Sequence, residues 1–217
     1  MEDYKKLYNT LYKKGYHKSG FAGKALMSFL QKKYTLSPKD QVLDIGCSNG
    51  SGVKIINDLA GSNICYGFDV ADDAIDYCNR KNPNNKDKYK VASLPNIPFD
   101  DDAFNVIFCS DVLEHLFPED VDESFNEINR VTKKNSHIFL DIALVPESNR
   151  YNDVLRQYQL ENLHATLFSS KKWFDIFNQH NLKIQDYVVE YEVNGKEING
   201  KDYSNKEGSL HVYLIKK

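Results

Sequence analysis

The stretch Gln41-Val-Leu-Asp-Ile-Gly-Cys-Ser-Asn-Gly-Ser-Gly52 determines how the rest of this chain is organised. Its apolar beginning at 42–45 predicts a buried strand, its glycines predict a tight turn, and the apolar spacing of residues 53–59 predicts a helix. Together they form a binding site of the nucleotide type, because glycine lets a ligand approach the backbone and a helix N-terminus presents free N–H groups. Asp44 lies inside the strand, where a carboxylate is costly to bury unless it has a hydrogen-bonding role.

The spacing of the glycines distinguishes three kinds of ligand-binding loop. A dinucleotide pattern G-x-G-x-x-G started at Gly46 meets Ser48 and Ser51, and one started at Gly50 fails at Ile55. The phosphate-binding pattern G-x-x-x-x-G-K-[ST] also fails at Ser51. The remaining pattern, hydrophobic-Asp-x-Gly-Cys-x-x-Gly, resembles the first motif of the class I S-adenosylmethionine (SAM)-dependent methyltransferases. Ser48 stands where that family more often has glycine, and a small residue still permits a tight turn.

This resemblance implies SAM as the cofactor and S-adenosylhomocysteine as its product. It places the backbone of Gly46, Cys47 and Ser48 at the methionine end of SAM, with Gly50 in the same loop. Asp44 is then expected to accept a hydrogen bond from the ammonium group of SAM or to brace the loop.

The second predicted strand, 63–68, ends at Asp69, about 20 residues after the glycine loop. An acid at this place can accept hydrogen bonds from a ribose diol, and the alternative role is a simple cap. Val70 follows it at the cofactor edge. Further along, the segment that begins Ser93-Leu94 resembles the family's adenine-facing turn. Ser93 takes the place of the usual Asp and can still bond the adenine amine, while Leu94 offers the ring an apolar face.

A near-continuous apolar strand at 104–109 runs into Ser110-Asp-Val-Leu-Glu-His-Leu116, which resembles the family's fourth motif. Ligands of open α/β sheets bind at the carboxyl ends of strands, so this edge suits a site. The resemblance implies that Ser110 and Asp111 line the cofactor near its methyl group. His115 is a candidate for the cofactor site and for catalysis, and its alternative role is a helix-start residue bonded within the fold.

An acceptor hydroxyl or amine has to lose a proton during methyl transfer, usually to a positioned base. Imidazoles titrate near neutral pH, so we expect His115 or His164 to act as this base. His164 belongs to the irregular segment 144–168, where this fold often builds a substrate lid; an ordinary packed loop is the alternative. The chain shows no metal-ligand cluster with convincing spacing, so no metal is predicted.

Residues 1–36 predict a helical cap before the SAM-binding domain at 37–217, the two forming a single domain overall. Aromatic and lysine residues alternate in the first helix, a pattern that suits contact with RNA or, more simply, a helix that packs one stripe and solvates its lysines. In similar methyltransferases the segment before the next helix closes over the cofactor. Tyr16 and His17 are therefore candidate cofactor residues, with a surface loop as the alternative.

Composition excludes several classes of protein. Apolar residues make up 41% and charged residues 27% of the 217, as in ordinary globular domains. No segment approaches about 18 uninterrupted apolar residues, and the N-terminus lacks a secretory core, so we expect a cytoplasmic protein that does not span a membrane. The net charge of −3 disfavours bulk nucleic-acid binding. The four cysteines are scattered and are expected to be buried and reduced.

The order of elements predicts an α/β, Rossmann-like fold. Five strands alternate with helices, the fifth of them at 137–143. The two long strands at 182–193 and 209–216 form a hairpin that is necessarily antiparallel. A seven-stranded, mostly parallel sheet with a C-terminal antiparallel hairpin is the class I methyltransferase layout.

The predicted function is methyl transfer from SAM to the oxygen or nitrogen of a small-molecule acceptor, such as a sugar or a secondary metabolite. Compactness and mild acidity favour a small acceptor over a polymer. The alternatives are an RNA or protein methyltransferase that uses the Tyr- and Lys-rich first helix, and a non-catalytic SAM-binding partner subunit. The oligomeric state is not predicted.

Overall fold

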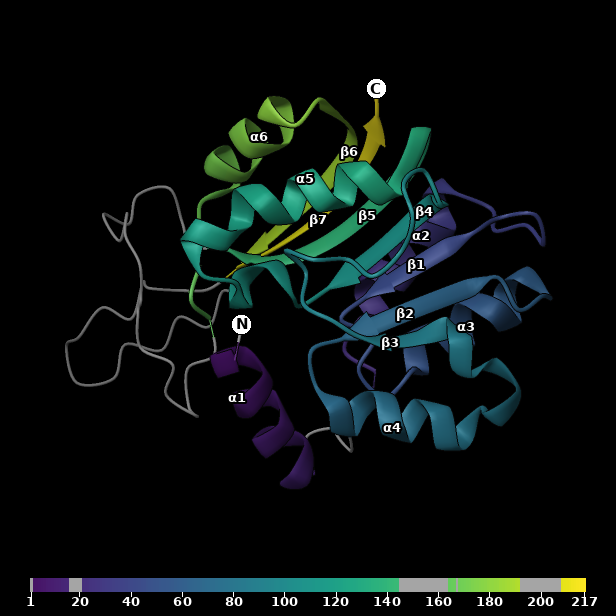
Figure 1. The fold of residues 1–217 in the computed structure, drawn as a ribbon. Coiled ribbons are helices and arrows are strands. Elements are labelled where there is room, and N and C mark those ends of the chain that lie inside the picture. Colours follow the sequence, from purple (N-terminus) through teal and green to yellow (C-terminus); the bar gives the residue numbers. More distant parts are fainter. Residues whose placement is uncertain (1, 16–20, 145–163, 167, 192–207) are drawn as a thin grey trace.

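The computed structural model describes residues 2–15, 21–144, 164–166, 168–191 and 208–217. Its centre is a seven-stranded sheet in the order β3-β2-β1-β4-β5-β7-β6 (Figure 1). The strands are β1 (Val42–Ile45), β2 (Cys65–Asp69), β3 (Tyr89–Val91), β4 (Phe104–Ser110), β5 (Thr132–Leu144), β6 (Leu182–Tyr191) and β7 (Gly208–Lys216).

The sheet has the predicted mixed direction. β1 pairs in parallel with both β2 and β4, and the next pairs outward, β2 with β3 and β4 with β5, are parallel as well. β7 runs antiparallel between β5 and β6. The predicted α/β fold with a C-terminal antiparallel hairpin is therefore confirmed. Because β1, β2 and β4 are parallel neighbours, the segments that follow them meet at one edge of the sheet.

The fifth strand is longer than the sequence predicted. It begins at Thr132 instead of His137, and its first residues are polar. They still pair with β4, where Phe104 lies opposite Thr132 before an irregularity shifts the register at Val106. A run of apolar residues does not reveal such a segment, because its strand structure depends on pairing with the neighbouring strand β4.

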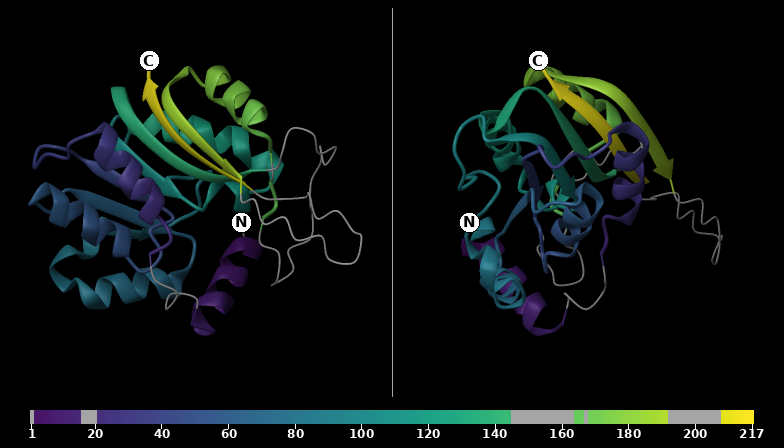
Figure 2. Two further views of the ribbon diagram at one scale, coloured as in Figure 1. Left: turned by 180° about the vertical axis from the view of Figure 1, so that it is seen from behind. Right: turned by 90° about the vertical axis from the view of Figure 1, so that its right-hand side faces the viewer.

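Helices cover both faces of the sheet. One face packs against α2 (Lys24–Lys33), α3 (Ser51–Ala60) and α4 (Asp72–Lys81), and the other against α5 (Val121–Val131) and α6 (Ser170–Gln179). The view from behind shows α2 in front of the sheet (Figure 2).

Strand alternation explains the two cores. Val42 of β1 packs with Leu30 of α2, whereas its neighbour Leu43 packs in the core that contains Phe125 of α5 and Trp173 of α6. The four cysteines are buried and unpaired, as expected.

The first helix, α1 (Glu2–Lys13), lies beside α4 (Figure 1). The Nζ atom of Lys5 lies 3.0 Å from Oδ2 of Asp72, and the Nδ2 atom of Asn9 donates to the same oxygen at 3.2 Å. Tyr12 packs on Ala71 and Ala74. These contacts place α1 at the start of α4, next to the end of β2. The division of the chain at residue 36 stays a prediction.

Candidate active site

The glycine turn after β1 brings the backbone close to the loop after β4. Gly46 has a φ of +70°, in the left-handed region that favours glycine, and a Cβ atom there would clash with the side chain of Val112. The N–H of Cys47 donates to the carbonyl oxygen of Phe68 at 2.9 Å, which links the turn to β2. The turn is therefore fixed by neighbours on both sides of β1.

Asp44 lies beneath this turn, against the first residues of α3. Its side chain is buried, and a Cβ atom at Gly52 would lie only 2.6 Å from its Oδ2 atom. Burial, followed by the charge of Asp69, raises the pKa of Asp44 to about 8, while a hydrogen bond from the N–H of Val53 acts in the opposite direction. Asp44 is thus mainly protonated at neutral pH in the free protein, and an ammonium group beside it would favour its carboxylate.

Ser48 connects three parts of the chain. It has a φ of +50°, in the left-handed region that glycine adopts most readily. Its hydroxyl accepts a hydrogen bond from the hydroxyl of Tyr12 on α1. Its backbone N–H donates to Oδ2 of Asp69 at 3.0 Å.

Asp69 is the last residue of β2 and is buried. Its Oδ1 atom accepts a hydrogen bond from the N–H of Ala71 at 2.9 Å. Burial raises the pKa of Asp69 to about 6, although the N–H groups of Ala71, Ser48 and Val70 stabilise its carboxylate. Each carboxylate oxygen keeps further lone-pair capacity, so Asp69 can accept hydrogen bonds from a diol.

The turn that begins at Ser93 forms another wall. The Oγ atom of Ser93 is buried and has no hydrogen-bond partner within the described part of the chain. A buried hydroxyl without a partner is uncommon in a folded protein and fits a ligand that would bond it. Leu94 beside it is buried, as an apolar contact for an aromatic ring requires.

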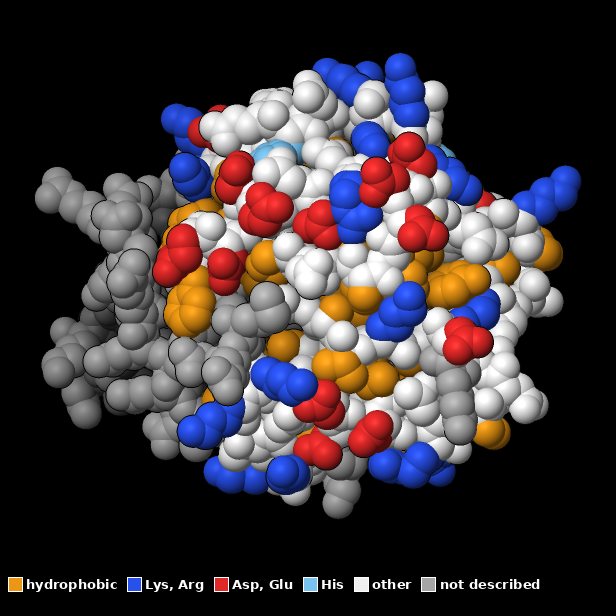
Figure 3. Space-filling view, viewed as in Figure 1, with side chains coloured by type: hydrophobic (Ala, Val, Ile, Leu, Met, Phe, Trp, Pro, Cys, Tyr) orange, Lys and Arg blue, Asp and Glu red, His pale blue; other side chains and the backbone are white. Residues whose placement is uncertain are grey.

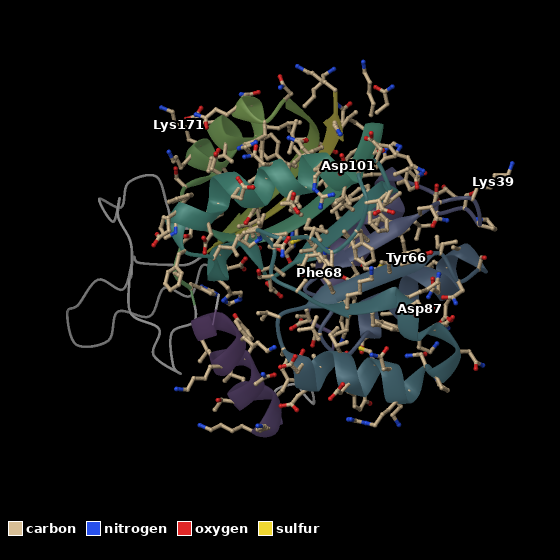
Figure 4. All side chains as sticks on the ribbon, viewed as in Figure 1. Lys39, Tyr66, Phe68, Asp87, Asp101 and Lys171 are labelled. Atoms are coloured by element: carbon tan, nitrogen blue, oxygen red, sulfur yellow. The ribbon has the colours of Figure 1, made fainter. Side chains whose placement is uncertain are left out.

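Arg130 of α5 holds the continuation of this turn in place. Its guanidinium donates to the carbonyl oxygens of Ile97 and Phe99, both at 2.8 Å, and to Glu127 and Asp101. Asp101 is labelled in Figure 4, where it lies near α5. Arg130 was not among the predicted residues, because only the fold brings Asp101 and the carbonyl oxygens of Ile97 and Phe99 near it.

The carboxyl end of β4 supplies the wall opposite Asp69. Ser110 donates from its hydroxyl to Oδ2 of Asp141 on β5 at 3.3 Å, and Asp111 follows with a φ of +54°. The chain then enters a short 3₁₀ turn, Leu113–His115. The ring of His115 lies edge-on to Tyr8 of α1, with centroids 6.0 Å apart.

These walls enclose a cavity of about 180 Å³ at the carboxyl edge of the sheet. Phe68, labelled in Figure 4, is one of its apolar lining residues. The predicted residues that line it are Asp44, Gly46, Cys47, Ser48, Asp69, Val70, Ser93, Leu94, Ser110, Asp111 and His115. The roles of these residues stay predictions.

Four predicted residues stand apart from this lining. Gly50 is absent from it and instead begins α3, with a φ of +76°. His164 also lies outside the lining, although its ring centroid is 5.0 Å from that of His115. Tyr16 and His17 fall outside the described residues.

Tyr8 and Tyr12 of α1 line the cavity as well, and the sequence analysis did not name them as site residues. Their spacing of four residues was visible as part of an aromatic stripe. The stripe was interpreted as packing or RNA contact, and only the position of α1 over the end of β2 shows that it reaches the cavity.

The sheet order and this cavity define an α/β protein of the class I methyltransferase type. The family described as methyltransferase domain matches residues 43–140. A phosphoethanolamine N-methyltransferase of Plasmodium falciparum (isolate 3D7) is 25% identical over 222 residues, which cover 98% of this chain and 80% of that relative.

Solved structures agree in fold. Geranyl diphosphate C-methyltransferase from Streptomyces coelicolor A3(2), in complex with Mg²⁺, geranyl diphosphate and S-adenosyl-L-homocysteine, matches with a TM-score of 0.67 at 15% identity, over 89% of this chain and 78% of that chain. Phosphoethanolamine N-methyltransferase 2 of Haemonchus contortus matches with a TM-score of 0.65 at 14% identity, over 88% of this chain and 52% of that chain.

Residues 43–140 form a class I SAM-dependent methyltransferase domain. The predicted family, enzyme class and cofactor are therefore confirmed, and the family implies a small molecule as methyl acceptor. Within the described residues, no helix is both long and apolar enough to cross a lipid bilayer.

Proposed function

We propose that this methyltransferase methylates a hydroxyl or amine of a small-molecule acceptor that binds between Tyr8, Asp111 and His115. The supporting observation is the place of His115, which lines the cavity and also touches both Tyr8 and His164. An acceptor beside His115 would thus have this imidazole within reach of its proton, with the ring of His164 next to it.

In this proposal, the glycine turn and Asp44 hold the methionine end of SAM. Asp69 accepts from the ribose hydroxyls, and Ser93 and Leu94 contact the adenine. Four observations support these roles: the buried acids in β1 and at the end of β2, the hydroxyl of Ser93 that has no partner among the described residues, the buried apolar side chain of Leu94, and the left-handed turn at Gly46.

SAM supplies a methyl group on a sulfonium, which is transferred by in-line displacement. The acceptor atom forms the new bond to the methyl carbon, the carbon–sulfur bond breaks, and its electron pair remains on sulfur. The protein's part is to align the acceptor and exclude water, for which the apolar side chains of Phe68 and Leu116 beside the cavity are suited. The acceptor proton leaves toward His115 and His164.

Two features favour a small acceptor over a polymer. The cavity is enclosed in part by α1, which packs on α4 through Lys5 and Asn9. On the face shown in Figure 3, Lys and Arg side chains are interspersed with Asp and Glu, so this face does not present a continuous basic surface for a nucleic acid.

The test is methyl transfer from labelled SAM into a panel of small amines and alcohols, including phosphoethanolamine, sugars and phenols, with RNA and protein extracts in parallel. Phosphoethanolamine is included because the relative that methylates it by name matches 98% of this chain. We expect transfer to a small molecule, and a loss of about 100-fold or more in His115→Ala, as is typical when a proton-transfer group is removed.

His137→Gln is the matched control, since His137 lies on β5 and bonds Tyr213 away from the cavity. Label found only in RNA or protein would overturn the proposal. A His115→Ala variant with full turnover would remove the imidazole from the mechanism.

A further inference from the structure

The structure brings together three metal-ligating side chains that the sequence separates. One ligand atom each from Glu114, His115 and His164 lies within 4.8 Å of the others. In tetrahedral sites with bonds of about 2.0–2.1 Å, ligand atoms are about 3.4 Å apart, so side-chain shifts of about an ångström would bring these three into coordination.

Among the described residues, only one of the two carboxylate oxygens of Glu114 accepts a hydrogen bond. Its Oε1 atom accepts a hydrogen bond from the N–H of Ala143 at the end of β5, at 3.2 Å. Its Oε2 atom is buried and has no hydrogen-bond partner among the described residues, and the whole side chain is 0% exposed. A fully buried carboxylate oxygen left without a donor requires another partner.

The fold holds His164 against the other two residues. The N–H groups of Ala165 and Thr166 both donate to the carbonyl oxygen of Glu114, at 2.8 and 2.9 Å. The hydroxyl of Thr166 donates to the carbonyl oxygen of Leu116 at 2.7 Å. Ala165 and Thr166 are themselves buried, so the position of His164 is fixed by the turn that carries Glu114 and His115.

We infer that Glu114, His115 and His164 bind a divalent transition-metal cation beside the cofactor cavity. Two imidazoles and one carboxylate suit Zn²⁺, Mn²⁺, Fe²⁺ or Co²⁺, whereas Mg²⁺ and Ca²⁺ prefer oxygen ligands only. Three protein ligands leave at least one coordination position open, which is the arrangement of catalytic sites.

His115 joins this cluster to the cavity, since it belongs to both. On the basis of the proposed function, the two imidazoles would act through a bound cation. A cation held by them would accept a lone pair of an acceptor hydroxyl, lower its pKa and let its proton leave to solvent, before the oxygen attacks the methyl carbon. The imidazoles would then act as ligands instead of free bases.

The test begins with protein freed of metal by a chelator. Zn²⁺, Mn²⁺, Co²⁺ and Mg²⁺ are titrated separately by calorimetry, and Co²⁺ binding is also followed by its visible absorption, which reports imidazole ligation without any turnover. We expect about one equivalent of Zn²⁺ or Co²⁺ to bind, at least about tenfold more weakly in His164→Ala and in Glu114→Gln, and with unchanged affinity in His137→Gln.

Neither Glu114 nor His164 lines the cofactor cavity, so thermal protection by SAM should persist in both variants and shows that they fold. The inference is overturned if none of the transition-metal ions binds, if only Mg²⁺ binds, or if binding is unchanged in both variants.

Different experimental results would overturn the metal inference and the proposed function. Full methyl transfer by the metal-free enzyme to its small acceptor, with loss in His115→Ala, would overturn the metal inference and leave the proposed function standing. A bound cation in an enzyme that methylates only RNA or protein would support the metal inference and overturn the proposed function.

Discussion

The backbone N–H of Ser48 donates to Oδ2 of Asp69 at 3.0 Å, and this bond ties the glycine turn after β1 to the end of β2. The turn predicted to hold the methionine end of the cofactor and the acid predicted to hold its ribose are therefore directly linked. Loss of this hydrogen bond is expected to disturb both the turn and the acid.

Asp69→Ala should weaken SAM binding about 100-fold in calorimetry. The substitution removes the acceptor for the ribose hydroxyls, and hydrogen bonds to charged groups are worth about 1.5–3 kcal/mol. Asp76→Ala is the matched control, since Asp76 is an exposed carboxylate on the neighbouring helix α4. Equal affinity in Asp69→Ala and wild type would remove Asp69 from the cofactor site.

SAM affinity should depend on pH through the same residue. Burial raises the pKa of Asp69 to about 6, so its carboxylate is ionised above pH 6 and protonated below it. Affinity is then lost as the pH falls through 6, approaching tenfold per pH unit. In Asp69→Asn the loss of affinity near pH 6 should disappear, and a loss that persists near pH 6 would assign the titration to a group other than Asp69. For the free protein the sign is opposite: because the folded pKa lies above the ordinary 3.8, the contribution of Asp69 to stability is lost as the pH rises from about 4 to 6.

Gly46→Ala should destabilise the protein by about 2–4 kcal/mol, from the left-handed backbone and the clash with Val112. Gly61→Ala is the matched control, because Gly61 has a φ of +63° but a Cβ atom there would meet nothing within 4 Å. Thermal unfolding of Gly61→Ala measures the cost of the left-handed backbone alone, and the additional loss in Gly46→Ala measures the clash with Val112. Adding Val112→Ala to Gly46→Ala should restore part of the loss, and equal melting temperatures for the two glycine variants would contradict this account.

Ser48→Gly should relieve the left-handed strain of about 1 kcal/mol but lose the hydrogen bond from Tyr12. The two effects are separated by making the change in a Tyr12→Phe background, where the bond is already absent. There Ser48→Gly should raise the melting temperature by about 2–4 °C. SAM affinity should hold, because residue 48 keeps the N–H that donates to Asp69. A lower melting temperature in that background would mean that Ser48 has another partner.

The sequence was informative where functional residues are close in the chain or follow directly from a strand. Asp44, Gly46 and Ser48 belong to one continuous motif, and the apolar run before them identifies the strand that carries them. Asp69 is separated from this motif along the chain, but its place in the site could still be predicted, because the carboxyl ends of neighbouring parallel strands meet at one edge of the sheet.

The sequence by itself thus determined the order of strands and helices and part of the cavity lining, because strand and helix periodicity and strand-end position are local properties. The cofactor followed from the resemblance of the glycine motif to that of the methyltransferase family. Only the tertiary structure placed Tyr8 against His115 and His164 beside Glu114. These pairings depend on how α1 docks on α4 and on hydrogen bonds from Ala165 and Thr166 to the turn after β4. Contacts between distant segments are set by packing and by the need to satisfy buried polar groups, and spacing along the chain does not encode them.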